Sequence, residues 1–114
     1  MQYALMIYAE PGYLEALPEA DQAAARAEFE ALREDARYAG GTWLQPAETA
    51  TCVRAAGGRT LMTDGPFADT KEIFAGFYLI EADDLDQATE LAARIPAVRI
   101  GGSVEIRPVV IERG

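Results

Sequence analysis

Apolar and polar positions follow two different spacings along the chain, which indicates alternating strands and helices. Residues 3–8 form an unbroken apolar run of strand-forming side chains, typical of a central strand with both faces covered. Between residues 18 and 39 the apolar positions instead recur every three or four residues, which predicts an amphipathic helix that ends at Gly40 and Gly41. The apolar members of this repeat are Ala25, Phe29, Leu32, Ala36 and Ala39.

The middle of the chain favours short strands. Residues 42–44 predict one strand, and residues 49–54 and 59–63 predict the two arms of a hairpin that turns across residues 55–58. Residues 76–82 are again mostly apolar and strand-forming, which predicts a second central strand.

A second helix is expected near the end of the chain. Asp83 or Asp84 caps it, and Gln87, three residues after Asp84, completes the pattern of a capping box. Pro96 ends this helix, and the alternation of residues 103–109 predicts a final half-buried strand. The apolar stripe of the helix consists of Leu85, Ala88, Leu91, Ala92 and Ile95.

The order of these elements predicts an α+β fold, a ferredoxin-like split βαβ unit with an inserted hairpin, in one domain over residues 1–114. Two helices can cover only one face of such a sheet. Residues 3–8 and 76–82 are nevertheless apolar on both faces, and no further element of the chain is left to cover the second face. A second copy of the chain is the economical cover, which predicts a homodimer.

The charge of the chain narrows the range of partners. The sequence has 19 acidic and 10 basic residues, a net charge of −9. Such an excess repels phosphate backbones and anionic lipid, so neither direct nucleic-acid binding nor membrane association is expected. The same charge could also serve solubility alone.

The sequence contains no histidine and a single cysteine, Cys52. The usual metal ligand and the usual base at neutral pH are therefore missing, and we predict neither a metal site nor a cofactor. Cys52 lies in an alternating stretch and is expected to behave as a small buried hydrophobe. A strand pattern begins directly at the first residues, without a signal-peptide pattern, and no apolar run approaches about 20 residues. These features predict a cytoplasmic protein.

The polar segment over residues 63–72, of sequence TDGPFADTKE, and the GFYLIE strand that follows it closely resemble the DGPF-type branch of the YCII-related proteins. Residues 94–96 and 101–108 resemble the C-terminal segment of that family, and residues 3–8 resemble its first strand. The resemblance therefore extends over nearly the whole chain. It implies a dimeric α+β barrel, in which two ferredoxin-like sheets pack face to face.

The resemblance implies less about activity. Some YCII-like proteins are enzymes, among them a dehydrochlorinase that acts on chlorinated aromatic rings, and these enzymes share a His–Asp pair. That pair cannot form here because the chain has no histidine. Proteins of the DGPF-type branch also tend to be encoded beside extracytoplasmic-function sigma factors, which suggests a sigma factor as a partner.

The same polar segment holds the candidate site. A desolvated Asp64 could act as a base or a ligand acceptor, and Lys71 could hold an anionic ligand or tune that carboxylate, so we predict these two as catalytic residues. The alternative is structural, because Asp64-Gly65-Pro66 has the composition of a turn and Lys71 could form a surface ion pair with Glu72. The aromatic candidates equally suit a core or a dimer interface. The residues predicted to contact a ligand are Tyr8, Thr63, Phe67, Thr70, Glu72 and Tyr78.

Two functions follow from these observations. The first is a homodimer that binds a small molecule in a pocket near Asp64, with catalysis left open. The second is a non-catalytic regulatory partner of a sigma factor, in which an acidic surface meets a basic one.

Overall fold

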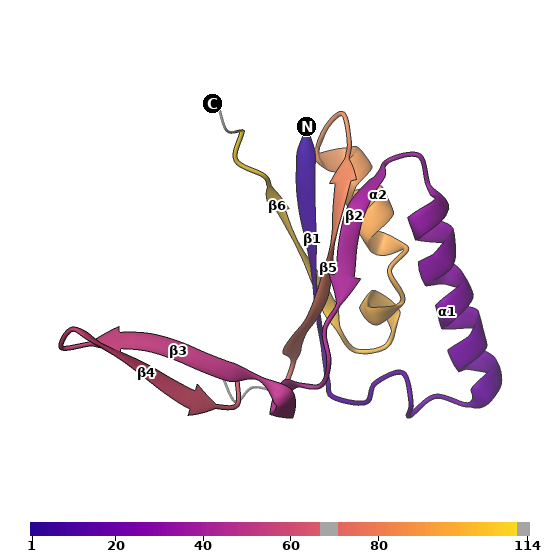
Figure 1. The fold of residues 1–114 in the computed structure, drawn as a ribbon. Helices are drawn as coiled ribbons and strands as arrows, with labels where there is room; N and C mark the ends of the chain where they lie inside the picture. Colours follow the sequence, from indigo (N-terminus) through magenta and orange to yellow (C-terminus); the bar gives the residue numbers. More distant parts are fainter. Residues whose placement is uncertain (67–70, 112–114) are drawn as a thin grey trace.

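A four-stranded antiparallel sheet forms the body of the protein in the computed structural model, which describes residues 1–66 and 71–111 (Figure 1). Its strands lie in the order β2-β5-β1-β6. This order and the two helices confirm the predicted ferredoxin-like α+β fold. The strands are β1 (Gln2–Ala9), β2 (Tyr38–Trp43), β5 (Ile73–Glu81) and β6 (Ser103–Pro108).

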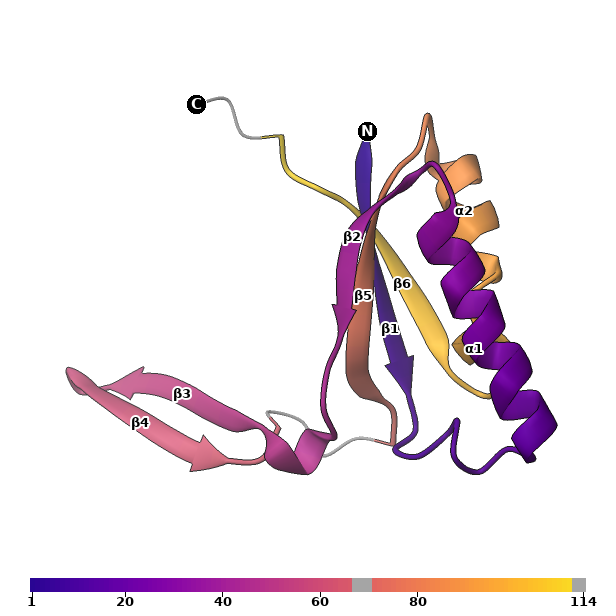
Figure 2. The ribbon, with the colours of Figure 1, turned by 45° about the vertical axis from the view of Figure 1, so that its right-hand side comes forward.

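Both helices cover the same face of this sheet, α1 (Glu19–Glu34) and α2 (Leu85–Ala93) (Figure 2). The core lies between them and the sheet, where Leu5, Ile7 and Leu91 are at most 1% exposed. A short 3-10 turn, η2 (Pro96–Arg99), adds Ala97 to the core. In the part of the chain that the structure describes, neither helix is long and apolar enough to cross a membrane.

The inserted hairpin is a separate two-stranded sheet of β3 (Thr51–Ala56) and β4 (Arg59–Asp64), reached through a 3-10 turn, η1 (Ala47–Thr49). Residues 51–64, called the arm below, project from the end of the body on the side away from the helices (Figures 1 and 2). Its turn falls at Gly57 and Gly58, which both have positive φ. The prediction of this hairpin is confirmed.

Helix α1 ends at Glu34, five residues before the predicted end at Ala39. The carboxylate of Asp35 accepts hydrogen bonds from the backbone and side chain of Arg37, at 2.9 and 3.0 Å, which turns the chain out of the helix. These bonds also hold the pKa of Asp35 well below its usual range. Ala36 and Ala39, which fitted the helical spacing, are exposed instead.

The two glycines expected to end that helix lie inside β2. Gly41 has a φ of +148°, and a Cβ atom there would lie 2.3 Å from the carbonyl oxygen of Phe77 on β5. Glycine is therefore required for the close approach of β2 to β5, rather than for helix termination.

The capping box of α2 is confirmed. The Asp84 carboxylate accepts from the backbone N–H of Gln87 at 2.9 Å, and the Gln87 side chain accepts from the backbone N–H of Asp83 at 3.0 Å. The helix ends at Ala93, slightly before Pro96, which begins η2.

The second face of the sheet has no cover within the described residues, in agreement with the expectation that the two helices cover one face only. The side chains that alternate with the core residues lie on this open face. They include Met6 on β1 and Phe77 and Leu79 on β5, all half-buried. The polar residues Ser103, Glu105 and Arg107 flank them on β6.

Candidate functional site

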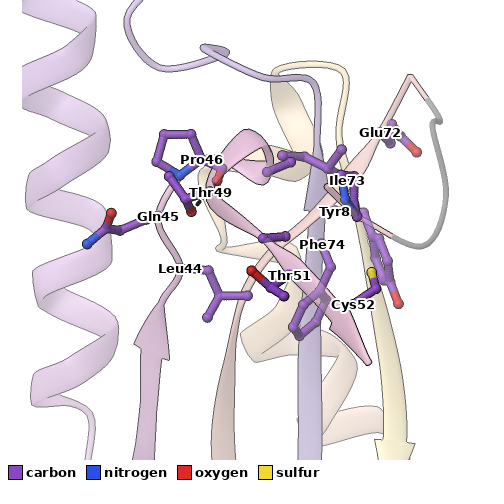
Figure 3. A pocket seen from close by; sticks show the side chains of 13 residues that line it. Tyr8, Leu44, Gln45, Pro46, Thr49, Thr51, Cys52, Glu72, Ile73 and Phe74 are labelled. Atoms are coloured by element: carbon purple, nitrogen blue, oxygen red, sulfur yellow. Dashed lines mark hydrogen bonds between the residues drawn. The ribbon is translucent and has the colours of Figure 1, made fainter. Parts of the chain in front are cut away.

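A pocket of about 520 Å³ lies in the corner where the arm leaves the body (Figure 3). It is bounded by the ends of β1 and β5, by the segment after β2, and by the base of the arm. Apolar groups make up most of its wall. The described residues that line it are Tyr8, Leu44, Gln45, Pro46, Ala47, Thr49, Ala50, Thr51, Cys52, Pro66, Glu72, Ile73 and Phe74.

An aromatic pair forms the wall on the side of the sheet. The rings of Tyr8 and Phe74 lie 5.6 Å apart and tilted by 60°. They are cross-strand partners because β5 bulges here: Ile7 pairs with Gly76, Tyr8 pairs with Phe74, and Ala75 between them has no partner in the ladder. Phe74 is 38% exposed, so the pair presents an aromatic surface to the pocket.

The base of the arm forms the opposite wall. The thiol of Cys52 donates to the carbonyl oxygen of Gly65 at 2.9 Å, and the backbone N–H of Gly65 donates to the carbonyl of Ala50 at 2.7 Å. These bonds join the two strands of the arm where it begins. Cys52 is buried, as predicted, and its burial occurs in this wall.

The polar groups of the pocket are few. Glu72 is the charged side chain among the described lining residues, and it accepts a hydrogen bond from the Ser103 hydroxyl at 3.4 Å. Tyr8 adds a phenol, and the remaining polar side chains are Gln45, Thr49 and Thr51. Apolar walls with a few polar groups are typical of small-molecule sites.

A second, more polar hollow adjoins this pocket and shares Tyr8 and Glu72 with it. It also contains Glu10 and Lys71, whose carboxylate oxygen and Nζ lie 3.3 Å apart. Lys71 is 87% exposed, so solvent screens this ion pair and it contributes little to stability.

The predicted site residues fall in different places. Tyr8 and Glu72 line the pocket. Asp64 ends β4, is exposed, and among the described residues forms no ion pair with Lys71, which pairs with Glu10 instead. The catalytic role predicted for Asp64 and Lys71 stays a prediction.

The other residues predicted to contact a ligand also lie in different places. Thr63 is exposed on β4 opposite Cys52. Tyr78 lies on the helix-covered side, 1% exposed and packed edge-on against Phe29 and Tyr38, so it belongs to the core. Phe67 and Thr70 lie outside the described residues.

Sequence reasoning missed Leu44, Ile73 and Phe74 as pocket residues. The sequence pattern places Leu44 in a predicted strand and predicts that the second central strand begins at Gly76. In the structure that strand, β5, begins at Ile73. The apolar pair Ile73-Phe74 was the available signal, because an earlier start of β5 brings it opposite the end of β1.

The described residues offer no metal centre. Within residues 1–66 and 71–111, no group of three or more cysteine, aspartate or glutamate side chains is placed to hold a metal ion. The polar groups of Glu72 and Tyr8 can hydrogen-bond a ligand beside the aromatic wall.

Comparison with known structures places the fold. The chain is similar to 5-chloro-2-hydroxyhydroquinone dehydrochlorinase of Burkholderia phenoliruptrix AC1100, solved in complex with 2,5-dihydroxybenzoquinone. The TM-score is 0.52, the identity is 19%, and the match covers 96% of this chain and 94% of the other. This likeness is one of fold.

Comparison of sequences gives a closer relative and a family. The chain is 41% identical over 69 residues to an uncharacterized protein of Rhizobium meliloti (strain 1021). That match covers 60% of this chain and 56% of the relative, so the chain spans little more than half of the relative's length. Residues 1–112 match the YCII-related domain. The chain therefore belongs to the YCII-related domain family.

Proposed function

We propose that this protein binds a small aromatic molecule in the pocket at the base of the arm. The observation that carries the proposal is the Tyr8–Phe74 pair, which faces a mostly apolar space of about 520 Å³. Pockets of small-molecule sites have roughly 300 to 1,000 Å³. An aromatic ring placed here would gain ring–ring contact with the pair in addition to the burial of its own apolar area.

The polar groups favour an uncharged ligand with hydrogen-bond donors. Glu72 can accept a hydrogen bond from a hydroxyl or amino group of the ligand. It also repels carboxylates and phosphates, as does the net charge of −9. The dehydrochlorinase of similar fold is named for a hydroxylated aromatic substrate, which is a compound of this class.

A matched pair of probes tests this proposal. We expect 2-naphthol to bind in calorimetric titration and 2-naphthoate, which has the same rings and a negative charge, to bind at least about tenfold more weakly. Phe74→Ala should weaken 2-naphthol about tenfold, since it removes half of the aromatic wall. Leu85→Ala is the control, because Leu85 is an exposed apolar residue on α2. Absence of 2-naphthol binding at millimolar concentration would refute the proposal.

Glu72→Gln separates the charge from the shape of the pocket. The amide oxygen can still accept from Ser103, and the variant removes the negative charge. Binding of 2-naphthoate should therefore strengthen, and the preference for 2-naphthol should shrink. An unchanged preference would mean that the charge of Glu72 does not select the ligand.

Two finer assignments belong to the same proposal. The Asp64-Gly65-Pro66-Phe67 sequence supports a place in the DGPF-type branch of the family. The open apolar face of the sheet supports the predicted homodimer. The regulatory alternative, a sigma-factor partner, stays a prediction from the resemblance, because the contacts of the described residues do not bear on it.

A further inference from the structure

We infer that a third hollow, on the helix-covered side of the sheet, binds a small organic cation of the quaternary ammonium type. The hollow has a volume of about 500 Å³ and is lined by the loop that leads from β1 to α1, by residues 43–48 and by the start of β5 (Figure 1). This volume is within the range of roughly 300 to 1,000 Å³ for small-molecule sites. The site is distinct from the pocket of the proposed function and takes a different class of ligand.

Two aromatic side chains line this hollow, Trp43 at the end of β2 and Tyr13 on the loop after β1. Trp43 is 36% exposed even though its ring packs edge-on against Phe29, with 4.5 Å between the ring centroids. A cation within about 6 Å of the face of an aromatic ring is attracted by the ring quadrupole, most strongly by that of tryptophan. The accessible indole therefore offers a contact for a positive charge.

Three carboxylates belong to the same hollow, those of Glu10, Glu15 and Glu48, and the described residues that line it include no lysine or arginine. Glu10 pairs with Lys71, whose side chain is 87% exposed and lies outside the lining. Burial and, second, the negative charge of Glu15 raise the pKa of Tyr13 to about 12, so this carboxylate acts on the phenol through space. The hollow therefore attracts cations and repels anions.

The placement of the carboxylates narrows the kind of cation. Within the described residues, no group of three or more cysteine, aspartate or glutamate side chains is placed to hold a metal ion. Calcium and magnesium need several oxygen atoms at about 2.0 to 2.6 Å, whereas an organic cation spreads its charge over its alkyl groups. Much of the remaining wall is apolar and includes Ala9, Leu14 and Ile73. Methyl groups around a positive nitrogen suit such a wall, as does the ring of Trp43.

The hollow and the aromatic pocket lie on opposite sides of the sheet. Residues 44–46 line both and separate them, and the backbone N–H of Leu44 fixes this segment to the carbonyl of Ala75 at 2.9 Å. Tyr8 in the pocket lies on the open face, whereas its neighbour Ala9 in the hollow is buried on the covered face. The two ligands therefore reach the protein from different sides.

Trp43 is the only tryptophan of the chain, so its fluorescence reports directly on this hollow. Choline and 3,3-dimethylbutan-1-ol are matched probes, because they share a shape and differ in the positive charge. In about 0.15 M salt, which screens distant charges, choline should change the fluorescence saturably and bind at least about tenfold more tightly than the neutral alcohol. Equal affinities, or no response to choline at about 100 mM, would overturn the inference.

Two double variants separate the local charge from the overall charge. Glu15→Gln with Glu48→Gln removes two carboxylates of the hollow, and Glu34→Gln with Glu90→Gln removes two exposed carboxylates of the helices outside it. All four positions are exposed, so circular dichroism should show both variants folded. Choline should bind about fivefold more weakly to the first variant and less than about twofold more weakly to the second. Equal weakening would assign the effect to the overall charge and exclude a local site.

Trp43→Phe tests the aromatic contact. The variant keeps a ring against Phe29 and Tyr78, and thermal unfolding checks that it folds. Calorimetry measures choline binding here, because the variant has no tryptophan. The affinity should fall about threefold, since a phenylalanine ring attracts cations less strongly than an indole. Wild-type affinity in this variant would show that Trp43 does not contact the cation.

Discussion

The two faces of the central strands β1 and β5 are both largely apolar but have different surroundings. On the helix-covered face, Leu5, Ile7 and Tyr78 are at most 1% exposed. On the open face, Met6 and Phe77 alternate with them along the same strands and remain half-buried. Apolar character alone therefore does not tell which side chains hold the chain together and which are available to a partner or ligand. The comparison assigns the stability of the single chain to the covered face, whereas the side chains of the open face stay accessible.

The largest expected change in stability comes from placing an aspartate on one face or the other in two separate variants. Ile7→Asp buries an unpaired carboxylate against the helices and should cost about 4 kcal/mol or unfold the chain. Leu79→Asp, on the open face, should cost a single chain about 1 kcal/mol and act mainly on the proposed dimer, which it should separate. Urea unfolding at low protein concentration, with sedimentation, measures both. Equal losses of stability would mean that the faces do not differ.

Two phenylalanines sharpen the same comparison. Phe29 on α1 is 6% exposed, and its ring lies 4.5 Å from that of Trp43. Phe29→Ala should therefore cost about 3 to 4 kcal/mol. Phe74→Ala, in the pocket wall, should cost less than about 1 kcal/mol and affect binding of 2-naphthol instead. Thermal unfolding gives the first comparison, and a reversed order would contradict the placement of the core.

Alkaline pH should lower the stability of the fold by ionising Tyr78, which lies on the helix-covered face of the sheet. Burial raises the pKa of Tyr78 to about 12, and among the described residues its hydroxyl has no hydrogen-bond partner. The folded chain holds this proton more tightly than the unfolded chain, so the contribution of Tyr78 to stability is constant below about pH 10 and falls as the pH rises toward 12.

Tyr78→Phe should weaken that dependence and stabilise the chain by about 1 kcal/mol, because it removes an unsatisfied buried hydroxyl. Some dependence should remain, since burial also raises the pKa of Tyr13 to about 12. Urea unfolding at pH 8 and pH 11 measures the difference. Loss of stability in Tyr78→Phe at pH 8 would show that the hydroxyl has a partner after all.

The smallest effect is expected from Lys71. Its ion pair with Glu10 is exposed, so Lys71→Met should change the free energy of unfolding by less than about 0.5 kcal/mol. A loss of 2-naphthol binding in this variant, with Asp64→Asn behaving alike, would restore the two residues as a functional pair.

The sequence predicted the fold well where its signals were local and redundant. Alternation, the Asp84–Gln87 box and the paired glycines of the arm each indicated one structure, and each is found. The end of α1 was mispredicted because Ala36 and Ala39 fitted the helical spacing, while the decisive contacts were those of Asp35 with Arg37 and Arg94. Arg94 lies 59 positions away in the chain, beyond the reach of a periodicity argument.

The site was predicted in part. The polar segment led to Glu72, and aromatic character led to Tyr8. Tyr78 was grouped with Tyr8 because both are tyrosines of central strands, and only the register shows that they lie on opposite faces. Tyr8 pairs with Phe74 on the open face, whereas Tyr78 pairs with Leu5 on the helix side.

The bulge in β5 makes the aromatic wall depend on how β5 pairs with β1 rather than on composition alone. Side chains on a strand take alternate faces, so in a regular ladder Ala75 would pair with Tyr8 and Phe74 would lie on the covered face. The bulge leaves Ala75 unpaired and brings Phe74 opposite Tyr8 instead. The carbonyl of Ala75 also accepts from the backbone N–H of Leu44 at 2.9 Å, which ties the exit of β2 to the same point. One-to-one pairing of Ala75 with Tyr8 would therefore erase the wall while leaving both aromatic residues in the sequence.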